Sequence, residues 1–298
     1  MTAISLTRSH RVRAVRLRRI ARQFCSHRLA LVALIFLVGL ALVAVLADVL
    51  APFDPRHQDY DVLNKGPSVH HWLGTDSLGR DMLSRLIHGA RVSLLSSVGA
   101  IALTLVIAVP LAIWSGYAGG LVDMVVMRIT DALQVIPPLV LALAIVGVLG
   151  PSVRNIVIAL SIIFAPSFIR LVRGEVLAVR EATYIEASRS IGSSPFYIVR
   201  RRVLHNIASP LIVQTSVTLG FALLAEAGLS FIGLGVQPPN PSWGNMLSTS
   251  YASIFTAPAQ IYIPGSAIAL TVFAFNLVGD GLRDVLGVSS ASISRHSL

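Results

Sequence analysis

Long apolar segments separated by shorter polar ones dominate this chain of 298 residues. About 20 consecutive apolar residues are enough for a helix to cross the hydrocarbon core of a bilayer. Six segments have this character: residues 29–50, 92–116, 124–149, 156–172, 210–235 and 261–278. We therefore predict an all-α membrane protein with six transmembrane helices.

Composition excludes a soluble domain. Hydrophobic residues make up 54% of the chain, charged residues only 13%, and the mean hydropathy is +0.75, whereas about a quarter of the residues in soluble domains are charged. The net charge of +10 could suit nucleic acid. The arginines, however, flank the apolar segments rather than a polar foldable domain, so we expect membrane lipid and no nucleic acid as partner.

Arginine also indicates the orientation. Residues 1–28 carry several arginines and no acidic residue, and segment 173–208 is again rich in arginine, whereas residues 237–260 contain neither Arg nor Lys. By the positive-inside rule, both termini and segment 173–208 are cytoplasmic. A signal peptide is the alternative for the first apolar run, but that run exceeds the roughly 7 to 15 residues of a secretory core. The predicted units are a basic cytoplasmic tail (1–28), a first transmembrane helix (29–51), an extracytoplasmic segment (52–91), a five-helix core (92–286) and a cytoplasmic tail (287–298).

Residues 183–207, here called the basic loop, form a polar island between two apolar segments. Gly192 interrupts the helical pattern, Ser194 can cap a new helix, and Pro195 suits a first helical position. The loop is therefore predicted to form two short helices joined by a turn.

The second of these helices has an amphipathic pattern. Phe196, Val199 and Val203 recur at spacings of three and four, and the arginines at 200–202 surround them. Such a helix needs a groove in which to dock, so we expect a separate protein on the cytoplasmic side.

Prolines and acidic residues inside the apolar segments mark irregular places. Each proline removes a backbone donor and bends or locally opens its helix. This can shape a translocation path or simply the helix packing. The prolines concerned are Pro110, Pro137, Pro138 and Pro166.

An ionised carboxylate inside a membrane costs several kcal/mol unless it is paired or hydrated. For Asp131 we expect a pair with Arg128, one turn away. For Glu226 we expect a helix interface or a water-filled path. Glu226, Pro137 and Pro138 are the candidates for a translocation path.

Catalytic and metal sites are not indicated. Lys65 is the only lysine, and its neighbours do not form a phosphate-binding Walker A loop. His70, His71 and His88 lack the acidic or sulfur partners of a metal site, so we expect no metal and no cofactor in this chain. Ser, His and Asp occur in no arrangement typical of an intramembrane enzyme.

The stretch Glu186-Ala187-Ser188-x-x-x-Gly192 resembles the EAA motif of permease subunits in bacterial ABC importers. His205 departs from the proline that often ends the second helix in that family. The resemblance implies that a coupling loop within 173–208 docks on an ATPase subunit, that ATP and Mg²⁺ bind the partner subunits, and that the contacts come from Tyr184, Glu186, Ala187, Ser188, Gly192, Pro195, Phe196 and Arg200.

Three further stretches resemble the C-type permeases of dipeptide, oligopeptide and nickel importers: residues 74–81 (GTDSLGRD), 226–235 (EAGLSFIGLG) and 279–284 (GDGLRD). The resemblance implies a type I ABC importer permease fold in the cytoplasmic (inner) membrane of a bacterium. It further implies a heterodimer with a B-type permease, two ATPase domains, and an extracytoplasmic solute-binding protein that delivers di- or oligopeptides. Nickel or another small solute is the alternative cargo.

This interpretation predicts alternating access driven by the ATPase partners. An ion-coupled secondary carrier would show inverted repeats and several midplane acids, which we do not find. A channel would explain the hydropathy but not the amphipathic basic loop. Dependence of transport on ATP separates these alternatives.

Overall fold

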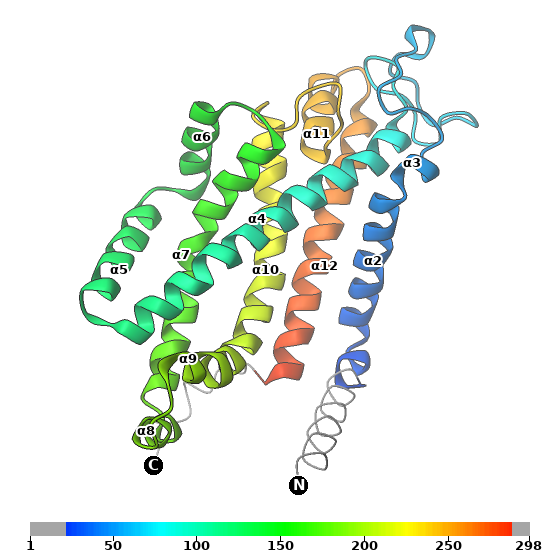
Figure 1. Ribbon diagram of the computed structural model, residues 1–298. Coiled ribbons are helices and arrows are strands. Elements are labelled where there is room, and N and C mark those ends of the chain that lie inside the picture. Colours follow the sequence, from blue (N-terminus) through cyan, green and yellow to red (C-terminus); the bar gives the residue numbers. More distant parts are fainter. Residues whose placement is uncertain (1–21, 288–298) are drawn as a thin grey trace.

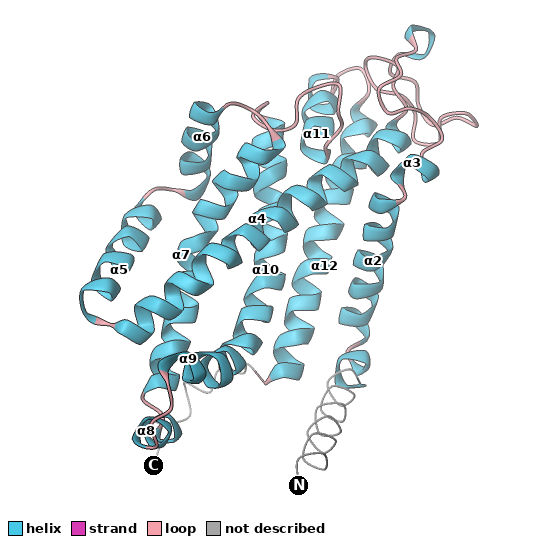
Figure 2. Ribbon diagram, in the orientation of Figure 1, coloured by secondary structure: helices cyan, strands magenta, loops and turns pink. Residues whose placement is uncertain are grey.

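The computed structural model describes residues 22–287, so the predictions for the tails at 1–21 and 288–298 lie outside it. Within this range the protein is helical and contains no β-strand (Figures 1 and 2). Five helices are long and apolar enough to cross a membrane once short flanking turns are included. They centre on α2 (Arg28–Val45), α4 (Met82–Ala118), α7 (Val153–Arg180), α10 (Leu204–Phe231) and α12 (Tyr262–Leu286).

The sixth predicted span is a broken one. Helix α5 (Gly120–Val135) and helix α6 (Pro138–Leu149) meet at a bend of 94°. The break falls at Ile136 and Pro137, both in extended conformations, because proline lacks an amide hydrogen and disfavours helix in the residue before it. The bend predicted from the proline pair is confirmed. At Pro110 and Pro166 the helices α4 and α7 continue through the proline.

Helix α4 begins ten residues before the predicted start of its span. The polar interval was expected to reach residue 91, but the helix starts at Met82. Asp81 caps it: the side chain accepts hydrogen bonds from the backbone N–H of Ser84 at 2.8 Å and from its hydroxyl at 2.7 Å. A capped polar turn extends the apolar helix, which hydrophobicity alone does not reveal.

Short elements gather at the two ends of the bundle. One end, here called the loop end, carries α8 (Thr183–Ser190), α9 (Pro195–Ile198) and the π-helical turn η2 (Val199–Val203). The opposite end, here called the far end, carries α3 (Ala47–Leu50), η1 (Tyr60–Val62), α11 (Trp243–Ala252) and η3 (Pro258–Ile261). The start of α2 and the end of α12 both lie at the loop end (Figure 1), where His27 and Asp284 approach to 3.9 Å.

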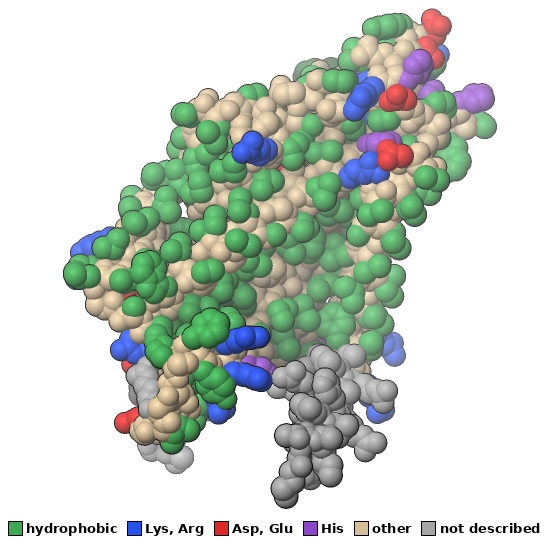
Figure 3. All heavy atoms as spheres, viewed as in Figure 1, with side chains coloured by type: hydrophobic (Ala, Val, Ile, Leu, Met, Phe, Trp, Pro, Cys, Tyr) green, Lys and Arg blue, Asp and Glu red, His purple; other side chains and the backbone are tan. Residues whose placement is uncertain are grey.

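Small residues let the central helices approach closely. Ala108 and Ala112 of α4 are fully buried against α7. A Cβ atom added to Gly116 would lie 3.0 Å from the side chain of Val176 of α7, so a larger residue there would force the two helices to adjust. Hydrophobic side chains cover the flanks of the bundle, whereas charged side chains concentrate toward its ends (Figure 3). This distribution is that of a membrane-spanning protein.

Candidate functional site

The basic loop has the predicted start and break. Gly192 adopts a φ of 78°, a left-handed conformation that glycine takes without steric cost. The Ser194 hydroxyl accepts from the backbone N–H of Tyr197 at 3.3 Å, and Pro195 occupies the first helical position. The interruption at Gly192 and the new helix start at Pro195 are confirmed.

The second predicted helix of the basic loop is not a separate short helix. From Pro195 the chain passes through α9 and η2 directly into α10, so residues 195–231 form one continuous helical segment. His205 stands where the family often has a proline, and unlike proline it keeps a backbone N–H that the helix can use. The loop is therefore rigidly attached to a spanning helix.

The predicted apolar stripe is divided between the outside and the core of this chain. Phe196 is 73% exposed, as expected for a side chain that docks on a partner, whereas Val203 is buried and Val199 packs against the same core. Ile198 and Ile207 are also buried, and the π-helical turn contributes to this, because its wider turn brings positions five apart, such as Ile198 and Val203, onto one face. These side chains and Ile185 of α8 belong to the same hydrophobic cluster as the central parts of α4, α7 and α10.

An apolar surface remains uncovered on the outside of the loop. Its large exposed side chains are Tyr184, Ile191, Phe196 and Tyr197. Glu186, Ala187, Gly192, Pro195 and Arg200 are also exposed, whereas Ser188 is buried and its hydroxyl donates to the carbonyl of Tyr184 at 2.8 Å. Of the eight residues expected at an ATPase contact, all but Ser188 therefore lie on the accessible surface of the loop.

Tyr184 connects the two parts of the basic loop, α8 and the helical segment that begins at Pro195. Its hydroxyl accepts a hydrogen bond from the side-chain amide of Asn206 at 3.1 Å. The guanidinium carbon of Arg202 lies 5.8 Å from the centre of the Tyr184 ring, within cation–π distance. Helix α8 is thus held against the start of α10.

An ion pair fastens α7 to the α4–α5 turn. Nη2 of Arg173 donates to Oδ2 of Asp123 at 2.5 Å, and the hydroxyl of Ser115 donates to Oδ1 of Asp123 at 2.6 Å. Arg180 reaches the carbonyl of Gly116 at 3.3 Å. These contacts were not predicted from the sequence. The arginines at 173 and 170 of α7 face the acids at 123 and 131 of α5, and the two helices run antiparallel.

Asp131 has a different partner from the one predicted. Its Oδ1 accepts from Nη2 of Arg170 in α7 at 2.7 Å, and the predicted pair with Arg128 is wrong. Packing of α5 on α7 brings the Arg170 guanidinium directly to the carboxylate, and sequence spacing within one helix carries no information on such a neighbour.

Glu226 lies at a helix interface, one of its two predicted environments. It is fully buried, and Oε1 accepts from the hydroxyl of Ser230 at 2.7 Å. The hydroxyl of Ser93 on α4 also interacts with the carboxyl group. Pro137 and Pro138 lie apart from it, exposed at the α5–α6 bend. A role of these three residues in translocation stays a prediction.

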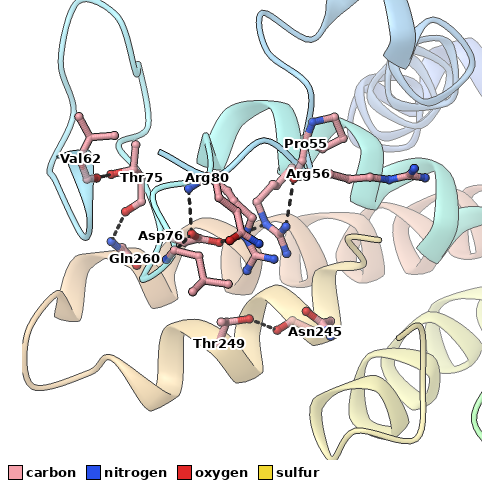
Figure 4. A network of polar contacts seen from close by, with 12 residues as sticks. Pro55, Arg56, Val62, Thr75, Asp76, Arg80, Asn245, Thr249 and Gln260 are labelled. Carbon is pink, nitrogen blue, oxygen red and sulfur yellow. Dashed lines mark hydrogen bonds and ion pairs between the residues drawn. The ribbon is translucent and has the colours of Figure 1, made fainter. Parts of the chain in front are cut away.

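A buried network of polar contacts connects the segments at the far end (Figure 4). Asp76 accepts from Nε of Arg80 at 2.7 Å and lies 3.4 Å from Nε of Arg85. The Thr75 hydroxyl donates to the carbonyl of Val62, and Gln260 donates to the carbonyl of Thr75 at 2.6 Å. The stretch 74–81 therefore joins the segment after α2 to the start of α4 and to η3.

A polar cavity of about 550 Å³ opens beside this network. Asp48, Arg56, His88, Arg91 and Asn240 are among its lining residues. Arg91 donates to Asp48 at 2.9 Å, and this hydrogen bond holds the pKa of the Asp48 carboxyl below its ordinary value. Among residues 22–287, no three His, Cys, Asp or Glu side chains are arranged to hold a metal ion.

Comparison with known proteins matches two families. Residues 108–288 match the binding-protein-dependent transport system inner membrane component. Residues 16–67 match the N-terminal TM domain of oligopeptide transport permease C.

Individual relatives agree with these matches. The glutathione transport system permease protein GsiD of Pectobacterium atrosepticum is 42% identical over 266 residues, which cover 89% of this chain and 88% of the relative. GsiD of Escherichia coli O157:H7 is 43% identical with the same coverage. The inward-facing MetNI methionine ABC transporter has a similar fold, with a TM-score of 0.56 and 20% identity over 68% of this chain and 97% of that chain.

The fold and the attached loop define the class as a type I importer permease of the inner membrane. The chain belongs to the inner-membrane permease family of binding-protein-dependent ABC importers, in its C-type, peptide-transporting branch. The resemblance inferred from the sequence motifs is confirmed.

Proposed function

We propose that this chain forms one half of a pathway for short peptides across the bacterial inner membrane and that the basic loop couples it to ATPase subunits. ATP and Mg²⁺ would be bound by those subunits, and this chain would supply the moving helices. Both termini and the loop would then lie in the cytoplasm, in agreement with the arginines at the loop end.

One observation carries the proposal: the basic loop packs inward with the spanning helices and leaves an apolar surface outward. Ile185, Ile198 and Val203 share one cluster with α4, α7 and α10. Phe196 and Ile191, which are 73% and 83% exposed, do not belong to that cluster. A partner docked on the exposed side would therefore move the core directly, since close-packed interiors transmit displacement rather than absorb it.

We propose the remaining subunits by analogy with the family. A B-type permease would complete the pathway, two ATPase domains would dock at the loop end, and a solute-binding protein would deliver cargo at the far end. The high identity to glutathione permeases supports a small peptide such as glutathione as the substrate class.

The test is uptake into proteoliposomes that contain this chain with its co-expressed partners. Labelled glutathione and a labelled dipeptide are supplied with the binding protein, with ATP inside or outside the vesicles or omitted, and with or without an ion gradient. We expect uptake of at least one peptide that requires ATP on the loop side. Uptake driven by an ion gradient without ATP would overturn the proposal in favour of a secondary carrier.

A further inference from the structure

Two cavities meet at Arg91, where α2 and α4 lie side by side near the far end (Figure 1). The first is the polar cavity of about 550 Å³ described above. The second is an apolar groove of about 450 Å³, here called the α2–α4 groove. Its walls include Leu37, Ala41 and Val45 of α2 and Leu94, Leu95 and Val98 of α4. Because Arg91 lines both, the polar cavity and the groove adjoin.

The two cavities occupy different levels of the membrane. The residues that line the groove fall within the apolar segments 29–50 and 92–116, apart from Arg91 itself. The polar cavity is lined by residues between 48 and 56, between 88 and 92, and at 240–241, which lie at or beyond the ends of those segments. Charged side chains gather at the far end, next to an apolar flank (Figure 3). Together the cavities therefore pass from the hydrocarbon region to the headgroup region, as a phospholipid does.

Arg91 is fixed at the boundary between the two cavities. Its Nε donates to the carbonyl of Ala44 at 2.8 Å, and Nη2 donates to the carbonyl of Val45 at 2.9 Å and to Asp48 at 2.9 Å. Carbonyls in the last turn of a helix lack donors within that helix, so these hydrogen bonds cap the end of α2. Arg91 is thus already paired, and any charged ligand of the polar cavity needs other partners.

Arg56 and Asp54 can supply those partners. Both line the polar cavity, and neither has an ion-pair partner among residues 22–287. Nη2 of Arg56 donates to Oδ1 of Asn240 at 2.7 Å, which holds the side chain against the loop after α10. Oδ1 of Asp54 accepts from the backbone N–H of Arg56 at 2.8 Å. The other guanidinium donors match a phosphate, and the second carboxylate oxygen can accept from an ammonium group.

The charges that line the polar cavity balance. Arg56 and Arg91 face Asp48 and Asp54, and with His88 neutral the formal sum is zero. A headgroup with a net charge would leave one sign in excess, whereas a headgroup that carries both a phosphate and an ammonium group preserves the balance. The cavity therefore suits a zwitterionic headgroup better than an anionic one.

We propose that the polar cavity and the α2–α4 groove together bind one phospholipid with an ethanolamine headgroup. Its phosphate binds Arg56, its ammonium group binds Asp54, and one acyl chain lies in the groove below Arg91. The bound lipid would hold the first spanning helix against α4 through a surface that side chains leave open. This site does not depend on which cargo the protein transports.

The first experiment identifies the lipid. The full chain is purified in detergent with its co-expressed partner subunits and incubated with phosphatidylethanolamine that carries a photoreactive group on one acyl chain. We expect cross-links within residues 37–45 and 94–98, located by mass spectrometry of peptides. Unlabelled phosphatidylethanolamine should compete about fivefold better than phosphatidylglycerol with the same chains. Equal competition would show ordinary boundary lipid, and no cross-link in these segments would show a groove closed by a partner subunit; either result overturns the proposal.

The second experiment tests the headgroup contact. Arg56→Gln should lower cross-linking about tenfold, because it removes a charge-assisted contact with the phosphate. Lys65→Gln is the matched control, since Lys65 is an exposed cation of the same interval that does not line the cavity. Equal cross-linking in the two variants would contradict headgroup binding at Arg56.

The third experiment tests the groove. Ala41 is exposed at its wall, so Ala41→Phe should occupy the groove without disturbing the core and lower cross-linking by a similar factor. Val38→Phe is the control, because Val38 is an exposed residue of α2 outside the groove. An unchanged Tm in both variants checks that they fold. Undiminished cross-linking in Ala41→Phe would overturn the proposal.

A free dipeptide separates a lipid from a peptide ligand, because it also carries an ammonium and an anionic group. We expect an excess of dipeptide to leave the cross-linking unchanged, since it has no acyl chain for the groove. Displacement of the photoreactive lipid by the dipeptide would assign the polar cavity to the cargo and overturn the proposal.

Discussion

The side-chain amide of Asn206 donates a hydrogen bond to the hydroxyl of Tyr184 across 3.1 Å. This contact joins α8 to the first turn of α10, which is itself a spanning helix. The guanidinium group of Arg202 lies over the same ring. These contacts fix α8 to α10, so a docked partner that displaces α8 would also displace α10.

Tyr184→Phe tests this junction. The change removes the acceptor of Asn206 but keeps the ring that Arg202 covers, so we expect a loss of about 1 kcal/mol in local stability. Limited trypsin cleavage within the basic loop should then be about five times faster at equal global stability. Tyr197→Phe, at an exposed tyrosine of the same loop, is the control. Equal cleavage rates for the two variants would show that the hydrogen bond does not hold the loop.

Asp81→Ala tests the early start of α4. The carboxylate caps the helix through Ser84 and lies 3.0 Å from Nδ1 of His71. Loss of the cap should cost about 1 to 2 kcal/mol. Thermal unfolding in detergent micelles, followed by circular dichroism, should show a lower Tm. Asp61→Ala, at an exposed aspartate of the same segment, should leave the Tm unchanged, and a similar drop in both would contradict the capping role.

Gly281→Ala tests the packing of α2 on α12. A Cβ at this position would lie 2.5 Å from Cβ of Ala30, so the helices must separate, at a cost of roughly 1 to 3 kcal/mol. At Gly265 of the same helix the nearest atom lies 3.8 Å away, and Gly265→Ala should be neutral or stabilise by up to about 1 kcal/mol. Thermal unfolding should show a lower Tm for Gly281→Ala and an unchanged or higher Tm for Gly265→Ala. A Gly281→Ala protein as stable as wild type would show that α2 packs less closely.

The lowered pKa of Asp48, at the far end, predicts that the stability of the protein depends on pH. Hydrogen bonds from Arg91 hold its pKa below the ordinary value of 3.8. A depressed folded-state pKa gives a contribution that is present above the unfolded pKa and is lost as the pH falls through the folded one. The Tm difference between wild type and Asp48→Asn should therefore be constant near neutral pH and shrink as the pH falls below about 5. A difference that grows on acidification would contradict this sign.

Several features of the fold were predictable because they depend on local chemistry. The six apolar segments follow from hydrophobicity, and the α5–α6 bend follows from Pro137 and Pro138. The break at Gly192 and the cap at Ser194 each depend on a single residue type. These signals do not require knowledge of which helices are neighbours.

Other features depended on neighbours or on small irregularities. Asp131 was assigned to Arg128 because both lie on one helix, whereas the actual partner is Arg170 on another. Ile198 was not predicted to face the core, and the π-helical turn at 199–203, which brings it onto one face with Val203, was not expected. No periodicity in the sequence marks that turn.

The central claim is that the basic loop transmits the action of the ATPase subunits, and Glu186→Arg in the assembled complex tests it most directly. ATP hydrolysis and ATP-dependent uptake of labelled glutathione are measured together, with Asp284→Arg, the same charge change at an exposed residue near the end of α12, as the control. We expect Glu186→Arg to abolish uptake, by lost docking or by hydrolysis without transport, while the Asp284→Arg complex works normally. Undiminished ATP-dependent uptake in Glu186→Arg would contradict the claim.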